Sequence, residues 1–114
     1  MFEVLDRALR ITVDVLEAGQ AGKEVDAAVR GIIDEAGYGP YFVHNLGHGI
    51  GLEVHETPRL ARGSTDLLET GMVFTLEPGI YIPDSGGMRL EEDVVLTEEG
   101  PVLLTRSSRA CAPE

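Results

Sequence analysis

Hydrophobic residues in the first third of the chain recur at three- and four-residue steps. The first set comprises Phe2, Leu5, Leu9, Val13 and Leu16, and the second comprises Val25, Ala28, Val29, Ile32 and Ile33. This spacing places apolar side chains on one face of a helix. The pattern predicts helices over residues 3–17 and 24–36, with Gly37 ending the second. We expect both apolar faces to pack against a common core.

Beyond Pro40 the pattern changes to short apolar runs separated by glycines. Glycine at 39, 47, 49 and 51 disfavours a helix, whereas the neighbouring β-branched and aromatic residues favour strands. Strands are predicted over residues 50–55, 72–82, 88–97 and 101–105, with a turn at 83–87. Two helices followed by antiparallel strands predict an α+β fold, with the two helices packed on one face of a curved antiparallel sheet.

Composition and charge narrow the classes of partner. The 114 residues make one small domain or part of a larger one. A net charge of -11 argues against nucleic acid and membrane surfaces as partners, because both carry negative charge. No apolar run is long enough to span a membrane, and the acidic first segment is unlike a signal peptide. We therefore expect a cytoplasmic protein. The single cysteine, Cys111, cannot form an internal disulfide, and no functional role is assigned to it.

All three histidines fall within residues 44–55, at His44, His48 and His55, and we expect them to share one site. Imidazole binds metals and exchanges protons near neutral pH, and the surrounding glycines allow backbone to approach a ligand closely. The alternative is that they are surface or core residues without a chemical role. Although His44 and His48 have the spacing of the two-histidine zinc helix, the glycines argue against a helix there.

Two glutamates interrupt otherwise apolar strands, Glu77 in VFTLEPGIYI and Glu91 in MRLEEDVVL. If Asp84 is the centre of the hairpin, residues whose numbers sum to 168 face each other, and this pair meets that condition. Directly opposed residues have Cβ atoms about 4.5–5.5 Å apart, so the two carboxylates would repel. A shared proton or bound divalent cations would neutralise them, and the nearby histidines favour cations. Alternatively, Arg89 forms an ion pair with a glutamate.

Other polar residues near these strands receive weaker assignments. The residue numbers of Thr75 and Asp93 also sum to 168, so these residues would share the face of the two glutamates as supporting groups. The remaining acidic residues of this region, in polar surroundings, are interpreted as solvated charges; they are Glu53, Glu56, Glu92, Glu98 and Glu99.

Three ordered segments resemble the pita-bread (M24-type) metallopeptidases, the family of Xaa-Pro dipeptidase (prolidase), aminopeptidase P and methionine aminopeptidase. They are HNLGHGIGLEVHETP at 44–58, GMVFTLEPGIYI at 71–82 and GMRLEEDVVLTEEGPVLLT at 87–105. The preceding KEVDAAVRGIIDEAGYG also resembles a family helix, so the similarity covers nearly the whole chain. GLEVHE together with RLEED is similar to the Xaa-Pro dipeptidase and aminopeptidase P branch.

The resemblance implies roles for individual residues. His48, Glu77 and Glu91 would be metal ligands, with Glu91 bridging two divalent ions. Mn²⁺ or Co²⁺ suits the mixed carboxylate and imidazole donors best, with Zn²⁺ or Fe²⁺ as alternatives. His44 and His55 would bind substrate and stabilise the developing oxyanion. Arg89 matches an arginine of the proline-specific branch, so the resemblance implies hydrolysis of the peptide bond before proline in short peptides.

The family also uses two aspartate ligands from an earlier hairpin, and no such stretch stands in this sequence. We therefore expect residues 1–114 to be the C-terminal half of a pita-bread catalytic domain, inactive alone. Such a half would form a homodimer or associate with the missing N-terminal half. The alternatives are a non-catalytic peptide- or protein-binding module, or another enzyme of the fold with methionine aminopeptidase-like or creatinase-like activity.

Overall fold

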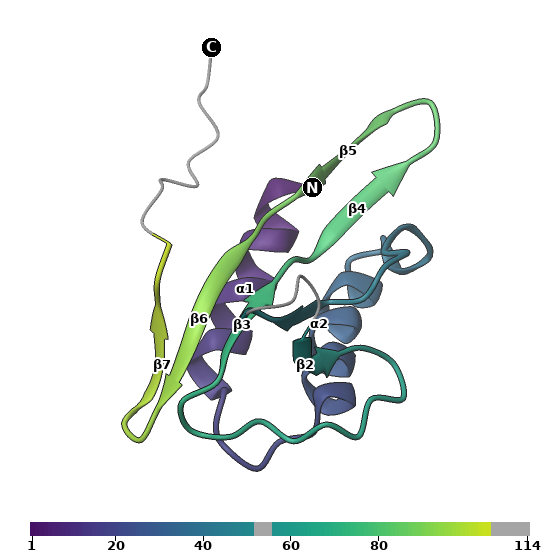
Figure 1. Cartoon of the computed structure of the whole chain (residues 1–114). Helices are drawn as coiled ribbons and strands as arrows, with labels where there is room; N and C mark the ends of the chain where they lie inside the picture. The colour runs from purple at the N-terminus through teal and green to yellow at the C-terminus, as the bar shows by residue number, and fades with distance from the viewer. Residues whose placement is uncertain (52–55, 106–114) are drawn as a thin grey trace.

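The computed structural model describes residues 1–51 and 56–105, and within them two helices open the chain (Figure 1). Helix α1 spans Phe2–Val15 and α2 spans Gly22–Glu35, so both predicted helices are confirmed with shifts of two residues or fewer at each boundary. Gly37, with a φ of 91°, follows α2 in the left-handed conformation that favours glycine. Neither described helix is both long and apolar enough to cross a membrane.

The remaining described elements are short. A single 3-10 turn, η1, covers Gly39–Tyr41, and the strands are β1 Gly47–Gly49, β2 Glu56–Leu60, β3 Val73–Leu76, β4 Gly79–Ile82, β5 Gly86–Arg89, β6 Glu92–Thr97 and β7 Gly100–Leu103. Five strands form an antiparallel sheet in the order β2-β1-β3-β6-β7, and β4 pairs with β5 in a separate two-stranded ladder. The α+β fold expected from the sequence is therefore confirmed, with both helices behind the larger sheet in Figure 1.

The hairpin register matches the prediction at every pair. Thr75 lies opposite Asp93 in the β3–β6 ladder, and Gly79 lies opposite Arg89 in the β4–β5 ladder. The residue numbers of each pair sum to 168, and Asp84, with a φ of 64°, lies at the centre of the turn. The two ladders are interrupted between Leu76 and Gly79 on one side and between Arg89 and Glu92 on the other.

Three strand predictions were wrong in detail. The predicted strands 72–82 and 88–97 are each broken in two, in part because Pro78 has no N–H to donate to a ladder. Ile50 and Gly51, predicted as the start of a strand over 50–55, lie outside any strand, and residues 52–55 lie outside the described part of the chain. The strands of this region are β1 and β2, on either side of that segment. Pro58 is tolerated in β2 because this strand lies at the sheet edge.

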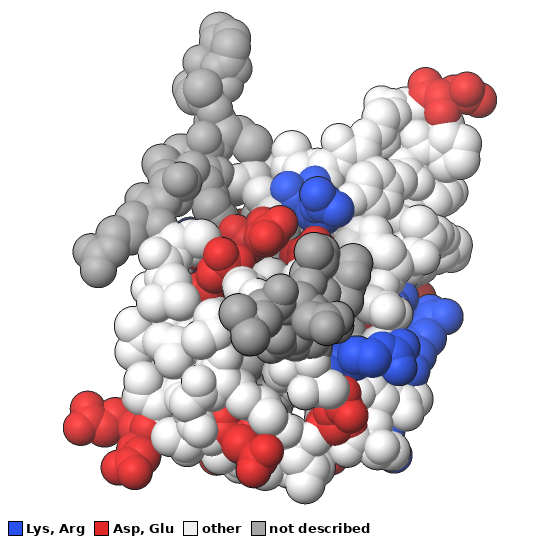
Figure 2. Space-filling view, viewed as in Figure 1, with Lys and Arg blue, Asp and Glu red and all other residues white. Residues whose placement is uncertain are grey.

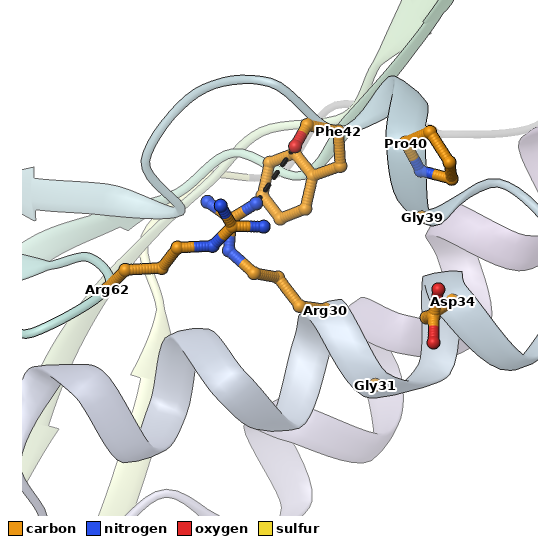
Figure 3. Close-up of a pocket in the computed structure, with 7 residues that line it drawn as sticks. All are labelled: Arg30, Gly31, Asp34, Gly39, Pro40, Phe42 and Arg62. Carbon is orange, nitrogen blue, oxygen red and sulfur yellow. Dashed lines mark hydrogen bonds between the residues drawn. The ribbon is translucent and has the colours of Figure 1, made fainter.

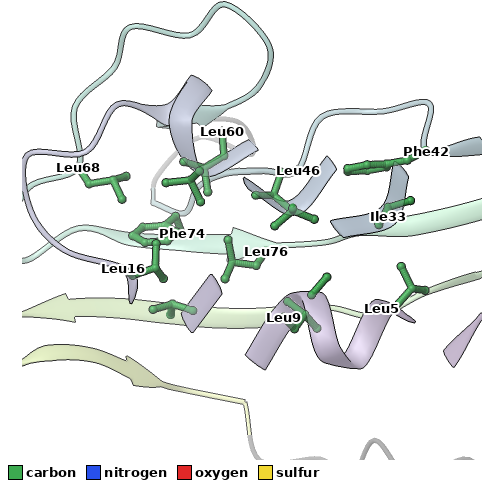
Figure 4. Packing of buried hydrophobic residues seen from close by; sticks show 14 of the residues in the cluster. Leu5, Leu9, Leu16, Ile33, Phe42, Leu46, Leu60, Leu68, Phe74 and Leu76 are labelled. Carbon is green, nitrogen blue, oxygen red and sulfur yellow. The ribbon is translucent and has the colours of Figure 1, made fainter. Parts of the chain in front are cut away.

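One hydrophobic core joins the helices to the sheet (Figure 4). Leu5 and Leu9 of α1 and Ile33 of α2 are fully buried, as are Phe74 and Leu76 of β3. Residues 74 and 76 have the period-two spacing of a strand whose one face packs on helices. The intervening Thr75 points to the opposite face, so this packing directs the one polar side chain of β3 away from the helices.

The far edge of the sheet remains apolar and exposed. Val102, Leu103 and Leu104, in and after β7, are 48%, 37% and 49% exposed. β7 pairs with β6 on one side only among the described strands, so its other edge presents backbone groups as well as apolar side chains.

Candidate functional site

The two predicted glutamates lie where both ladders are interrupted. Glu77 follows β3, and its backbone N–H donates to the carbonyl of Leu46 at 2.6 Å. Across the gap, the N–H of Leu90 donates to the carbonyl of Pro78 at 3.1 Å, and this bond keeps the two arms of the hairpin in register between the ladders. By the register of the ladders on both sides, positions 77 and 91 lie across from each other at the break, and the charge of Glu77 is close enough to raise the pKa of Glu91.

His48, in the middle of β1, directs its ring at Glu77. Its Nε2 lies 3.1 Å from the Glu77 Oε2 atom, and its Nδ1 lies 2.9 Å from the carbonyl oxygen of Gly49. A carbonyl oxygen only accepts hydrogen bonds, so Nδ1 must carry the proton. In the neutral ring Nε2 then carries a lone pair, and this nitrogen faces a carboxylate oxygen of Glu77.

Thr75 connects His48 to Glu77 through one hydroxyl. The backbone N–H of His48 donates to the Thr75 Oγ1 atom at 3.1 Å, and this hydroxyl donates to Glu77 Oε2 at 2.7 Å. Gly47 makes this arrangement possible, because a Cβ there would lie 1.9 Å from the Thr75 carbonyl oxygen. The supporting role predicted for Thr75 is consistent with these bonds.

Negative charge accumulates around Glu91. Partial burial raises the pKa of its carboxyl group, and the nearby charges of Glu77 and Asp93 raise it further, while Arg89 and His48 act in the opposite direction. The Glu91 side chain nevertheless remains exposed. Figure 2 shows acidic side chains beside a basic one on the sheet face turned away from the helices.

Arg89 lies beside Glu77, at 3.8 Å between Nη1 and Oε1. The ion pair that the sequence left as an alternative therefore exists. The Arg89 side chain is 52% exposed, and exposed ion pairs of this kind contribute about 0–1 kcal/mol to the free energy of unfolding. This contact neutralises only part of the charge at the two glutamates.

His44 lies in the same pocket as His48, which has a volume of about 370 Å³ and includes Glu77, Arg89 and Arg59 in its lining. The His44 Nδ1 atom is 2.8 Å from the Asn45 carbonyl oxygen and must donate to it. Its Nε2 is buried and has no hydrogen-bond partner among the described residues. Two predicted histidines therefore share one site, and the third, His55, lies outside the described residues.

The donor set suits a divalent cation. Two ligand atoms, each about 2.1 Å from one ion and at right angles to each other, lie about 3.0 Å apart, close to the 3.1 Å observed between His48 and Glu77. The Nδ1–H bond to Gly49 is the type of contact that orients a metal-binding imidazole. However, the described residues hold no group of three or more His, Cys, Asp or Glu side chains already arranged around a metal position.

Sequence reasoning was wrong about Glu92 and missed a buried ion pair. Glu92 is 5% exposed rather than solvated, and its carboxylate accepts a hydrogen bond from the Thr105 hydroxyl. Asp26 and Arg30 of α2 form an ion pair at 2.5 Å beside the segment that carries His44. The available signal was their i, i+4 spacing next to the apolar stripe of the second helix.

Comparison with known proteins gives a consistent result. The family model described as Metallopeptidase family M24 matches residues 1–98. The chain is 47% identical over 109 residues to an Xaa-Pro dipeptidase of Pyrococcus furiosus, covering 96% of this chain and 31% of that protein.

Solved structures give the same picture. The fold is similar to an Xaa-Pro dipeptidase from Bacillus anthracis, with a TM-score of 0.89, 48% identity and coverage of 94% of this chain and 30% of that one. It is also similar to an X-Pro aminopeptidase from Thermotoga maritima, with a TM-score of 0.90, 44% identity and coverage of 96% and 31%. The chain thus spans about three tenths of the length of these relatives.

Proposed function

Because this chain belongs to metallopeptidase family M24, we propose that it forms part of a metal-dependent peptidase that hydrolyses the bond before proline. The proposal extends the activity named for its relatives, which are Xaa-Pro dipeptidases, to a protein that contains this segment. The observation that carries it is the approach of His48 Nε2 to a Glu77 oxygen at 3.1 Å. An imidazole nitrogen and a carboxylate oxygen at this distance are bridged by a proton or by a cation.

In this proposal His48, Glu77 and Glu91 hold the metal ions. Divalent cations bound there would supply Lewis acidity to the scissile carbonyl and lower the pKa of a bound water. Binding would also relieve the repulsion that raises the pKa of Glu91. Mn²⁺ or Co²⁺ suits the mixed carboxylate and imidazole donors, and the presence of two ions is part of the same proposal.

The remaining pocket residues would orient the substrate. His44 presents Nε2, which accepts a hydrogen bond when the ring is neutral and donates one to a developing oxyanion when the ring is charged. Arg89, half-exposed at the pocket, would attract the carboxylate of a short proline-containing peptide. His55 is proposed as a second donor to the oxyanion, on the family resemblance alone.

The segment by itself should bind metal weakly and be inactive. Three donors without further ligands leave the carboxylates poorly compensated. We therefore propose association with a complementary segment, or a dimer, through the exposed apolar edge at β7. A cytoplasmic location also remains a prediction.

A chimera tests the peptidase function. The segment of the Bacillus anthracis Xaa-Pro dipeptidase that matches this chain is replaced by residues 1–105, and Xaa-Pro dipeptide hydrolysis is measured with Mn²⁺. We expect turnover that Glu77→Gln abolishes and that the exposed turn variant Glu98→Gln preserves. His55→Ala should lower kcat far more than metal content. A folded chimera that binds metal without hydrolysing Xaa-Pro dipeptides contradicts the proposal.

A non-catalytic binding module is the second candidate, favoured by the lack of a preformed three-ligand group among the described residues. Calorimetry on the 114-residue chain and on the chimera separates the two. A module of this kind predicts no Mn²⁺ binding by the chimera and binding of proline-containing peptides without turnover.

A further inference from the structure

A buried ion pair on α2 has no part in the proposed chemistry. The side chain of Asp26 is 1% exposed and that of Arg30 is 15% exposed, with Nε and Oδ2 at 2.5 Å. Removing two charges from water is costly, and buried pairs often contribute little net stability. Such a pair therefore needs an explanation beyond holding one helix together.

The polar atoms of this pair are directed at the backbone of residues 42–46. One terminal nitrogen of Arg30 donates to the Phe42 carbonyl at 2.8 Å and the other to the His44 carbonyl at 2.6 Å. The backbone N–H of Leu46 donates to Asp26 Oδ1 at 3.2 Å. Figure 3 shows Arg30 rising from α2 to Phe42, whose ring centroid lies 4.2 Å from the guanidinium carbon.

These contacts fall on every second residue of a segment without regular secondary structure. Residues 42–46 connect η1 to β1, and their other hydrogen bonds are local or go to Glu77: the Phe42 N–H donates to the Gly39 carbonyl, and the Leu46 carbonyl accepts from the Glu77 N–H. An apolar pair at 26 and 30 could fill the space but could not accept from Leu46 or donate to two carbonyls. The ion pair thus fixes the path of the backbone that carries His44.

The ring of His44 is held in a defined place by this path. It stands edge-on to the Phe42 ring at 5.2 Å between centroids and tilted against the Tyr81 ring at 5.5 Å. Gly79 leaves room for it, because a Cβ there would lie 2.9 Å from His44 Nε2. The positions of Phe42 and His44 depend on the guanidinium of Arg30, which donates hydrogen bonds to both backbone carbonyls.

We propose that Asp26 and Arg30 are positioning residues that hold residues 42–46 so that the His44 ring stays in the pocket. The catalytic consequence rests on the proposed function, whereas the placement of the ring does not. Positioning by a fixed, hydrogen-bonded group matters because displacement of a reacting group by about 1 Å can cost about 10²-fold in rate.

The placement is tested by NMR on the 114-residue chain. The ring protons of His44, assigned by their loss in His44→Gln, carry ring-current shifts from Phe42 and Tyr81. In Arg30→Met, Arg30→Lys and Asp26→Asn we expect these shifts to move toward those of a free imidazole, least in Asp26→Asn, which keeps an acceptor for Leu46. Retained amide dispersion identifies the variants that fold.

Val29→Ala is the matched control, because it removes fully buried core volume from the same helix while both the hydrogen bonds of Arg30 and those of Asp26 to residues 42–46 are kept. It should lower the unfolding temperature and leave the His44 signals in place. The proposal is overturned if the folded Arg30 and Asp26 variants keep the native His44 shifts, or if Val29→Ala moves them equally.

The chimera supplies a separate kinetic test. Arg30→Lys should lower kcat by about 10²-fold with unchanged Mn²⁺ content, while Val29→Ala leaves kcat within a few-fold at temperatures where it is folded. Equal kcat in Arg30→Lys and the parent contradicts the catalytic consequence. An inactive parent chimera contradicts the proposed function, and the NMR result still decides the placement of His44.

Discussion

The close approach of β1 to β3 makes Gly47→Ala the most informative single substitution. Its Cβ would lie 1.9 Å from the Thr75 carbonyl oxygen, whereas real Cβ contacts are essentially never under 3.0 Å. The difference, 3.0 less 1.9, requires a displacement of about 1.1 Å between two backbones. Neither backbone can move alone, because Thr75 is bonded to His48 and belongs to the β3–β6 ladder.

The magnitude follows from the contacts that must change. Overpacking costs about 1–3 kcal/mol, and weakening the bonds from His48 to Thr75 and from Glu77 to Leu46 costs about 1 kcal/mol more. We expect Gly47→Ala to lower the free energy of unfolding by about 2–4 kcal/mol. For a domain of this size, 1 kcal/mol corresponds to about 4–8 °C in Tm.

Urea denaturation followed by far-UV circular dichroism measures this effect, since the chain has no tryptophan for fluorescence. The control is Gly31→Ala on α2, where a Cβ meets nothing within 4 Å. Replacing this helical glycine should stabilise by about 0.5–1 kcal/mol. If Gly47→Ala stays within 0.5 kcal/mol of the parent, on the order of experimental error, the close approach is not a constraint on the fold.

Three further substitutions test other contacts. Burial and the charge of Glu77 raise the pKa of Glu91, so the folded state holds this proton more tightly than the unfolded state does. The free energy of unfolding therefore falls as the pH rises from below 4.5 through the raised pKa. Glu91→Gln in EDTA should therefore gain stability over the parent near pH 7 and lose that advantage near about pH 3; a pH-independent difference refutes the assignment. Phe74→Ala should cost about 3–5 kcal/mol in urea denaturation, since its side chain is fully buried, and a loss under about 1 kcal/mol would contradict the core described. Thr75→Val should cost about 1–3 kcal/mol by the same method, because its hydroxyl donates to Glu77. The control Thr12→Val should be neutral or stabilising, because the buried Thr12 hydroxyl has no partner among the described residues. Equal effects of the two substitutions would argue against the role of the Thr75 hydroxyl.

The helices and the hairpin were accessible from the sequence because each depends on local periodicity. The register followed from one turn, centred on Asp84, and from the period of two along the strands. That register correctly predicted Thr75 opposite Asp93, and its continuation on both sides of the break places position 77 across from position 91. The proximity of His48 to Glu77 is also confirmed, while their roles as ligands stay predictions.

Other features depended on contacts between distant segments. The interruption at Glu77 is stabilised by a bond to Leu46, 31 positions earlier, which no local pattern reveals. Asp26 and Arg30 have the spacing of an ordinary surface ion pair, and they are buried because residues 42–46 fold over them. The burial of Glu92 also depends on a later segment, because the chain beyond β7 places Thr105 beside it.

The continuous register across an interrupted ladder restricts how the β4–β5 hairpin can change in length. Insertion of one residue in the turn around Asp84 would shift the pairing and turn Glu91 to the opposite side of the sheet, away from Glu77. Balanced lengthening of both arms keeps the acidic pair together. Loop grafts and natural length variation in this arm should therefore be accepted in steps of two residues and rejected in steps of one.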